Sequence, residues 1–416
     1  MDNAHVKICK VRVHQTCCPV EDIPTKVRQE FTHIEKNIRP GMRIAITAGS
    51  RGVANIALVI KTVVECLKER GASPFIIPAM GSHGGATAEG QRAVLEGYGI
   101  TEEYIGAPIY SSLRVQKIDH IDKPDLNVYM DQYAWESDGV IAINRVKVHT
   151  DFHGAHESGI VKMLTIGLGK HAQALAVHHY GANGLRDYIP MVTERVIRSG
   201  KVLGAIALLE DGYDHTADVK AALPEEIFEV DHEFLERSRS MFAQLPFREI
   251  DSMIVDRMGK EISGTGMDPN VIGRIRIDGQ QDGFPHVKRL AVLDLSDGSH
   301  GNGIGVGLAD IATRKLAGKI DWKVTNENVI TSGFLSRGFL PIVAENDRQA
   351  VALTMATCGI PVTEDFRLVR IRDTLHLSEA YVSPALMKEL TETGRGEQIG
   401  EFRPIEFDSQ GNITPF

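Results

Sequence analysis

The apolar positions of the first half of the chain fall into two patterns that alternate. Short continuous apolar runs, typical of buried strands, occupy residues 42–47, 75–79, 139–144 and 202–209. Residues 55–70 instead carry apolar side chains three and four positions apart and end before Gly71, which predicts a helix that stops at a glycine. This strand–loop–helix order predicts a parallel sheet with right-handed crossovers.

The same order begins again after residues 211–249, which are expected to carry a polar connection and an amphipathic helix at 231–242. Strands are expected at 252–256 and 290–294, and helices at 307–316 and 346–358. The expected fold class is therefore α/β, with two domains of mainly parallel, Rossmann-like sheets. We place the domains at residues 1–250 and 251–416, with the site in the cleft between them.

The amino-acid composition restricts the classes of protein to which the chain can belong. With 43% hydrophobic and 24% charged residues, the 416-residue chain resembles an ordinary globular α/β protein. The net charge of −9 and the pI near 6.0 argue against a nucleic-acid partner. No apolar run approaches the roughly 18 residues of a membrane span, the N-terminus does not resemble a signal peptide, and the five cysteines lack C-x-x-C spacing. We expect a cytoplasmic protein with no membrane partner.

Two expected strands end in loops of small residues that each present one functional side chain. The sequence GSRG at 49–52 presents Arg51 near the start of a helix, where backbone N–H groups and a guanidinium favour an anion. The sequence GSHGG at 81–85 presents His83 among glycines that allow a ligand to approach the backbone closely. Loops at the carboxyl ends of parallel strands share one edge of the sheet, so both side chains are candidates for one site.

The stretch at residues 145–181 organises the candidate chemistry. It follows an expected strand directly and contains six of the sixteen histidines: His149, His153, His156, His171, His178 and His179. Lys162 lies in the same stretch among apolar neighbours, which leave little exposed surface for an ammonium group. Loops of the second half present Lys260 and His300 beside glycines in a similar way. A histidine cluster at a strand exit is a candidate site for proton transfer or metal binding.

Three kinds of protein fit these residues. A zinc hydrolase would use His149 with His153, or His153 with His156, which requires both imidazoles on one helical face. Phe152 and Gly154 disfavour a helix there. A nucleotide-binding protein without catalysis would leave the histidines without a role. An acid/base enzyme would place two histidines on opposite faces of a substrate carbon, since imidazole gives and takes protons near neutral pH.

Several local motifs occur together in the N-terminal half: GSRG at 49–52, GSH at 81–83, the pair Val148-His149, and the spacing from Lys162 to His178. In this combination the chain resembles the nickel-dependent lactate racemase family, whose members use the nickel-pincer nucleotide cofactor. Ala48, the segment 157–162 and the loop at 258–270 depart from the family's pattern. The resemblance therefore implies a divergent homologue that acts on a 2-hydroxy acid other than lactate.

The resemblance implies a racemase or epimerase that inverts the C2 configuration by hydride transfer to and from the nickel-pincer nucleotide. It assigns His83 and His149 as the acid/base pair and Lys162 as the covalent anchor of the cofactor. It assigns His178 as the nickel ligand. His179 is the rival for this role, because neighbouring helical residues point about 100° apart and only one can face the metal.

Arg51 and Lys260 are the candidates for holding the cofactor phosphate or the substrate carboxylate. The expected partners are the 2-hydroxy acid and, transiently, the enzymes that make the cofactor, with a homo-oligomer left open. No role follows from the sequence for His153, His156 and His300. The zinc hydrolase and a cofactor-less nucleotide-binding protein of the same fold remain the alternatives.

Overall fold

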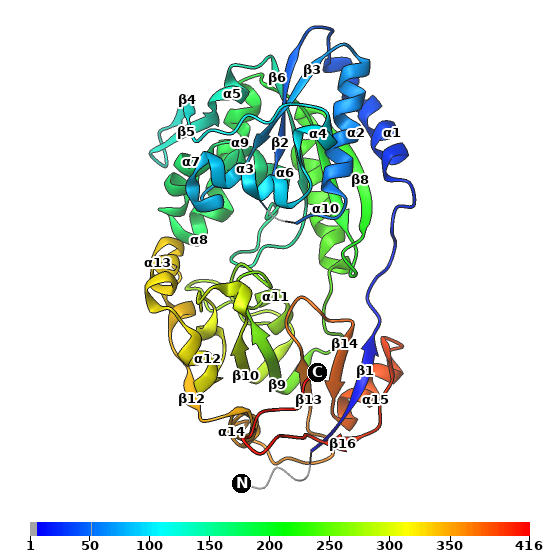
Figure 1. The fold of residues 1–416 in the computed structure, drawn as a ribbon, viewed down its shortest axis with the longest axis vertical. Helices are drawn as coiled ribbons and strands as arrows, with labels where there is room; N and C mark the ends of the chain where they lie inside the picture. Colours follow the sequence, from blue (N-terminus) through cyan, green and yellow to red (C-terminus); the bar gives the residue numbers. More distant parts are fainter. Residues whose placement is uncertain (1–5, 51) are drawn as a thin grey trace. The chain divides into compact units, whose positions relative to one another are not determined.

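The computed structural model describes residues 6–50 and 52–416, which form two compact units (Figure 1). The first unit consists of Thr16–Phe242, and the second combines Ala243–Phe416 with residues 6–15. Strand β1 (Lys7–Val13) joins the second unit because it pairs antiparallel with β14 (Glu379–Val382) and with β15 (Gly396–Gln398). The division thus differs from the expected one at residue 250, which assigns the N-terminal strand to the first domain.

Within the described residues, the first unit is built on a five-stranded sheet in the order β3-β2-β6-β7-β8. These strands span Ser73–Pro78, Arg43–Ala48, Gly139–Arg145, Val202–Glu210 and Thr216–Ala222. The first four are parallel, and β8 returns antiparallel to β7. The loops that follow the parallel strands therefore leave the sheet at one edge.

Helices α1 (Ile23–Ile34) and α2 (Ile56–Glu69) cover one face of this sheet. Alternate strand residues such as Ile44 and Ile46 point to that face and pack with the apolar sides of both helices. Each fully buried isoleucine contributes about 1.5–3 kcal/mol to stability. Gly71 adopts the left-handed conformation (φ 75°) directly after α2 and ends it, as the sequence predicts.

Short helices and a separate hairpin connect β3 to β6. The elements are η2 (Gly84–Ala86), α3 (Ala88–Gly97), α4 (Glu102–Ile105), β4 (Val115–Ile121), β5 (Leu126–Asp131) and α5 (Gln132–Trp135). Strands β4 and β5 form a two-stranded sheet of their own, and β5 packs against the helices that follow β6.

A nearly continuous helical region follows β6 and its loop. It consists of α6 (Ile160–Lys162), η3 (Met163–Gly167), α7 (Lys170–His178), α8 (Gly181–Asn183), η4 (Gly184–Tyr188) and α9 (Ile189–Arg198). Segments η3 and η4 are π-helical, a conformation that is rare and frequent at functional sites. After β8, η5 (Pro224–Glu226) leads into α10 (Ile227–Met241), which packs against β7 and α6.

In the described part of the second unit, a nine-stranded sheet has the order β12-β11-β10-β9-β13-β14-β1-β15, with β16 (Arg403–Pro404) beside β1. Strands β9 (Glu249–Met258), β10 (His286–Leu295), β11 (Ile311–Thr313), β12 (Ile342–Ala344) and β13 (Leu368–Ile371) are parallel. The connecting helices include α11 (Pro269–Ile272), α12 (Arg314–Lys319), α13 (Trp322–Ser332), α14 (Asp347–Ala356) and α15 (Pro384–Glu392). Short 3-10 turns complete the unit: η6 (Asp297–Ser299), η7 (Val306–Leu308) and η8 (Leu335–Gly338).

The α/β fold class with mainly parallel sheets is confirmed. The helix expected at 307–316 is wrong, because this segment contains β11 and only the start of α12. Pairing with β10 and β12 makes residues Ile311–Thr313 extended, and a local apolar pattern cannot reveal such partners. Among the helices that are described, none has both the length and the apolar character for crossing a membrane.

Candidate functional site

The loop after β6 brings His149 into contact with Lys162. Backbone hydrogen bonds between Lys147 and Ser158, with N···O distances of 2.7 and 3.2 Å, join the two ends of this loop. Helix α6 then returns Lys162 to the loop, where its Nζ is hydrogen-bonded to Nε2 of His149. The side chain of His149 is only 11% exposed, so bulk water screens this contact weakly.

The opposite side of the His149 ring is also held. The backbone N–H of Asp151 donates to Nδ1 at 3.0 Å, and Oδ2 of Asp151 lies 3.8 Å from the same nitrogen. The ring of Phe152 packs on the imidazole with a centroid separation of 4.6 Å. These contacts fix the ring so that Nε2 faces Lys162.

His178, at the C-terminal end of α7, belongs to the same group of side chains. Burial lowers the pKa of His178, the charge of Lys162 lowers it further, and Asp151 opposes both. A lowered pKa keeps the imidazole neutral at pH 7, which is the form that binds metals. We call His149, Asp151, Lys162 and His178 the lysine–histidine cluster.

The other histidines of this stretch have different surroundings. His179 is exposed, and its ring lies edge-on to Tyr180 with centroids 5.4 Å apart. Nδ1 of His171 is buried and has no hydrogen-bond partner among the described residues. His153 and His156 each lie next to a buried carboxylate, at 3.3 and 3.0 Å respectively. These two histidines therefore contact buried carboxylates of the protein.

The carboxylate beside His153 belongs to Glu157, which fixes the loop from its interior. Glu157 is 1% exposed and accepts the backbone N–H groups of His149 at 2.6 Å and Gly154 at 3.1 Å. Arg239 forms an ion pair with it at 2.7 Å. Burial raises the pKa of Glu157, but the hydrogen bonds from His153, His149 and Arg239 outweigh burial and hold the pKa below its ordinary value. An ionised Glu157 thus ties the His149 backbone to α10.

Helix α10 also fixes the start of α6. Its Asp231 is fully buried, lies 3.0 Å from Nδ1 of His156, and accepts the N–H of Val161 at 3.2 Å. Gly159 is required at this point, because a Cβ there would lie 2.1 Å from Oδ2 of Asp231. Since α10 supplies both Arg239 and Asp231, one helix positions the loop of His149 and the helix of Lys162.

His83 lies in the loop after β3 and is exposed. This loop packs against the helical region that carries Lys162 and His178: a Cβ at Gly81 would lie 3.0 Å from the Cβ of Ala174 and 3.3 Å from Ile166. Strands β3 and β6 flank β2, so the loops of His83 and His149 leave the same edge of one sheet.

A buried ion pair supports the loop of His83. The side chains of Lys170 and Asp131 are both 0% exposed, with Nζ and Oδ2 3.1 Å apart. Lys170 also donates to the carbonyl of Pro78 and lies 3.5 Å from Oε1 of Gln91, whose amide in turn donates to the carbonyl of Met80 at 2.8 Å. Burial lowers the pKa of Lys170 and raises that of Asp131, and the contact between them opposes both shifts.

The remaining candidates are Arg51, Lys260 and His300. Arg51 is outside the described residues. Lys260 belongs to the second unit, where its Nζ donates to the carbonyl of Gly264 at 2.9 Å and to Oδ1 of Asn328 at 2.6 Å. His300 also belongs to the second unit and adopts a left-handed conformation with φ 47°. The four residues of the lysine–histidine cluster all belong to the first unit.

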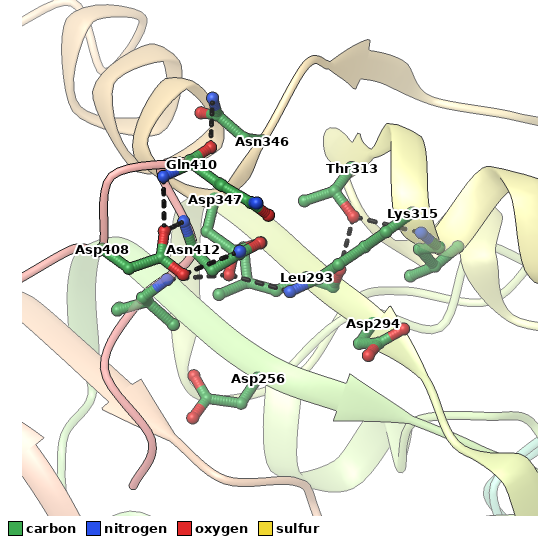
Figure 2. A network of polar contacts seen from close by, with 12 residues as sticks. Asp256, Leu293, Asp294, Thr313, Lys315, Asn346, Asp347, Asp408, Gln410 and Asn412 are labelled. Carbon is green, nitrogen blue, oxygen red and sulfur yellow. Dashed lines mark hydrogen bonds and ion pairs between the residues drawn. The ribbon is translucent and has the colours of Figure 1, made fainter.

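The second unit has a polar cavity of its own, of about 400 Å³, and Figure 2 shows several of its charged residues. Asp347 is fully buried and pairs with Lys315 at 2.9 Å. Arg370 makes two hydrogen bonds of 2.8 Å to Asp256. Burial raises the pKa of Asp256, and Arg370 opposes this shift. The four charges thus form two ion pairs that line the cavity.

Sequence reasoning missed the residues that hold the site in place: Glu157, Asp231, Asp131 and Lys170. Each is a charged residue in a sequence with many, and nothing local marks it as buried. The one available signal is that Lys170 lies within the apolar, glycine-containing segment 163–177, where a solvated ammonium is out of place.

No protein-family model matches the chain, and no curated protein matches it either. Among solved structures, the chain is similar to the lactate racemase apoprotein from Thermoanaerobacterium thermosaccharolyticum. The identity is 12% and the TM-score 0.49, over 83% of this chain and 86% of that one. A likeness at this level carries no conclusion about chemistry, so the functional argument rests on the side chains of the first unit.

Proposed function

We propose that the protein is a nickel-pincer nucleotide-dependent racemase or epimerase of a 2-hydroxy acid, with Lys162 as the cofactor anchor and His178 as the nickel ligand. The observation that carries the proposal is the lysine–histidine cluster. In it, a lysine amine contacts one histidine and lies close enough to a second to lower its pKa. This combination of nucleophile, proton-transfer group and metal ligand is what the resemblance requires.

The side chains present fit the cofactor. Lys162 is half-buried among apolar neighbours, an environment in which lysine serves as a nucleophile. His178 has a lowered pKa and is therefore a neutral imidazole near pH 7, and imidazole suits nickel. When bound, the cofactor would accept the C2 hydride of the substrate on its pyridinium ring and return it.

The protein's own residues would handle the proton of the substrate hydroxyl. His149, whose ring is held by Lys162 at Nε2 and by the Asp151 N–H at Nδ1, would act as one member of the acid/base pair. His83, exposed on the loop after β3 of the same parallel sheet, would act as the other member on the opposite face of the substrate. Arg51 is proposed to hold the substrate carboxylate or the cofactor phosphate.

The test is coexpression with cofactor-synthesis enzymes, followed by intact-protein mass spectrometry and metal analysis. We expect a covalent adduct and bound nickel in the wild type. Lys162→Arg should abolish the adduct while keeping the positive charge, because guanidinium cannot form the thioamide. His178→Ala should keep the adduct and lose nickel, and His179→Ala should keep both as the matched control. A wild-type protein without adduct and nickel, or an adduct that persists in Lys162→Arg, would overturn the proposal.

A second experiment tests the reaction type. Each enantiomer of a panel of 2-hydroxy acids is incubated with the loaded enzyme in D₂O. Hydride transfer predicts racemisation with C2 still carrying its original hydrogen, whereas direct deprotonation at C2 would introduce deuterium. His83→Ala and His149→Ala should each lower the rate by about 10²–10⁴, the usual contribution of one acid/base group.

A further inference from the structure

A second group of ligand-type side chains lies at the turn between β7 and β8. Asp211 is the first residue of this turn and His215 the last. The chain segment that opens the first unit crosses the turn: Gly212 donates its N–H to the carbonyl of Thr16 at 2.9 Å. Cys17 follows directly, so the crossing places its thiol beside the turn residues.

The ligand atoms of Cys17, Asp211 and His215 all lie within 4.8 Å of one another, and in the described part of the chain no other trio of His, Cys, Asp or Glu does so. Nδ1 of His215 lies 3.3 Å from Oδ2 of Asp211. Ligands of one tetrahedral zinc ion, with bonds of about 2.0–2.3 Å, are separated by roughly 3.3–3.8 Å. The His215–Asp211 pair is therefore already at ligand distance, and the Cys17 sulfur lies within 4.8 Å of a ligand atom of each.

The environment of Asp211 favours an ionised carboxylate that could bind a cation. Its side chain is 0% exposed, and burial raises its pKa, but the backbone N–H groups of Cys18, Tyr213 and His215 outweigh burial and hold the pKa below its ordinary value. These hydrogen bonds, of 2.9, 2.9 and 3.0 Å, fix the carboxylate without using all of its lone pairs. The result is an ionised carboxylate of set orientation between two exposed ligand residues.

The two neighbouring cysteines are not equivalent. The backbone N–H of Cys18 is bonded to Asp211, and burial and the charge of Asp211 raise the pKa of its thiol. Cys17, by contrast, supplies the sulfur that lies within reach of both other ligand atoms. Cys17 is exposed, as is His215, which leaves a path for an ion from solvent.

We propose that Cys17, Asp211 and His215 form a binding site for Zn²⁺. A thiolate, an imidazole and a carboxylate are the three donor types that zinc takes in proteins, and three protein ligands leave a fourth position for water or another ligand. The bound ion would join the segment that opens the first unit to the β7–β8 turn. The site shares no residue with the lysine–histidine cluster and does not depend on the proposed racemase activity.

The test uses the full chain freed of metal by a chelator, with Zn²⁺ as titrant against a competing chromophoric chelator and Co²⁺ as spectroscopic probe. We expect one tight equivalent of Zn²⁺ and a thiolate-to-cobalt charge-transfer absorption. Cys17→Ser and His215→Ala should each weaken zinc binding by more than about tenfold, the lower end of what a residue that only supports a ligand contributes. Cys18→Ser, the matched control, should bind as the wild type does.

A control in a second background distinguishes zinc binding at Cys17 from binding at His178. Titrations are repeated in the His178→Ala background, where binding at Cys17 should be unchanged. The proposal is overturned if the wild type takes up no zinc, if Cys17→Ser binds as tightly as the wild type, or if Cys18→Ser loses the charge-transfer band that Cys17→Ser retains. Circular dichroism of each variant at the start of the titration confirms that a loss of binding is not a loss of fold.

Discussion

Replacing Lys170 with methionine should strongly destabilise the first unit. Methionine keeps the approximate volume of lysine and the same cost of the left-handed backbone at this position, φ 57°, but removes the charge. Asp131 then remains as an uncompensated charge in a site where both side chains are 0% exposed. Removal of one partner of a buried ion pair costs about 3–5 kcal/mol. That is a large fraction of the roughly 5–15 kcal/mol that stabilises a typical domain.

The chain provides a convenient assay, because it has two tryptophans, one in each unit. Trp135 follows Asp131 closely in the first unit, and Trp322 is 40% exposed in the second. In a Trp322→Phe background, fluorescence reports unfolding of the first unit alone. With a urea m-value of about 2–3 kcal/mol/M, the expected loss lowers the urea midpoint by roughly 1–2.5 M.

A double-mutant cycle separates the ion pair from simple loss of packing. Asp131→Asn keeps an oxygen to accept the N–H of Ala134, a bond of 3.0 Å, but removes the charge. Combined with Lys170→Met, it should cost less than Lys170→Met alone, because no buried charge then remains. Costs that simply add, or a Lys170→Met cost below about 1 kcal/mol, would show that the pair is not energetically coupled and refute the reasoning.

The destabilisation caused by Lys170→Met should depend on pH in a defined direction. Burial already raises the pKa of Asp131, and loss of the Lys170 charge removes an opposing contribution and raises it further. A carboxyl whose pKa is higher in the folded than in the unfolded state destabilises the fold at neutral pH and less so in acid. The stability difference between wild type and Lys170→Met should therefore shrink as the pH falls from 7 toward the ordinary aspartate range. A difference that grows in acid would contradict this account.

Three further predictions concern the site. Glu157→Gln should lower the free energy of unfolding by about 1–3 kcal/mol and speed hydrogen exchange at the His149 amide. Because the pKa of Glu157 is lowered in the folded protein, the difference from wild type should vanish as the pH falls through that pKa. An undiminished difference in acid would count against this account. In NMR titrations the pKa of His178 should lie below its ordinary value of 6.5, and it should rise in Lys162→Met. An unchanged pKa in this variant would show that the charge of Lys162 does not affect His178. Gly167→Ala should destabilise the first unit by about 1–3 kcal/mol in thermal unfolding, because its Cβ would lie 2.8 Å from a backbone carbonyl oxygen, and a neutral result would mean that η3 can shift.

Much of the fold was predictable, because the spacing of apolar residues along the chain indicates many of the strands and helices. The runs at 42–47 and 139–144 form β2 and β6, and the helical spacing at 55–70 forms α2, each within a residue or two. Buried parallel strands are apolar on both faces, and helices that cover them are apolar on one, so each element carries its own signal. The strand–loop–helix order then leads to a parallel sheet with functional loops at one edge.

Two strands were not predictable in this way. Strand β8 lies inside the segment expected to be a polar connection, and its extended form depends on antiparallel pairing with β7. The place of strand β1 in the second unit depends on its pairing with β14, far along the chain. Hydrogen-bond partners separated by hundreds of residues leave no mark in a local pattern.

The candidate site, too, was predictable only in part. The sequence by itself determined which side chains were available, since histidines, Lys162 and glycine loops at strand exits stand out by type and position. Only the tertiary structure decided that Lys162 meets His149, that His178 is kept neutral, and that Glu157 and the Lys170–Asp131 pair hold the loops. The physical reason is that protonation and orientation depend on burial and on the nearest charges, and both are properties of the packed chain.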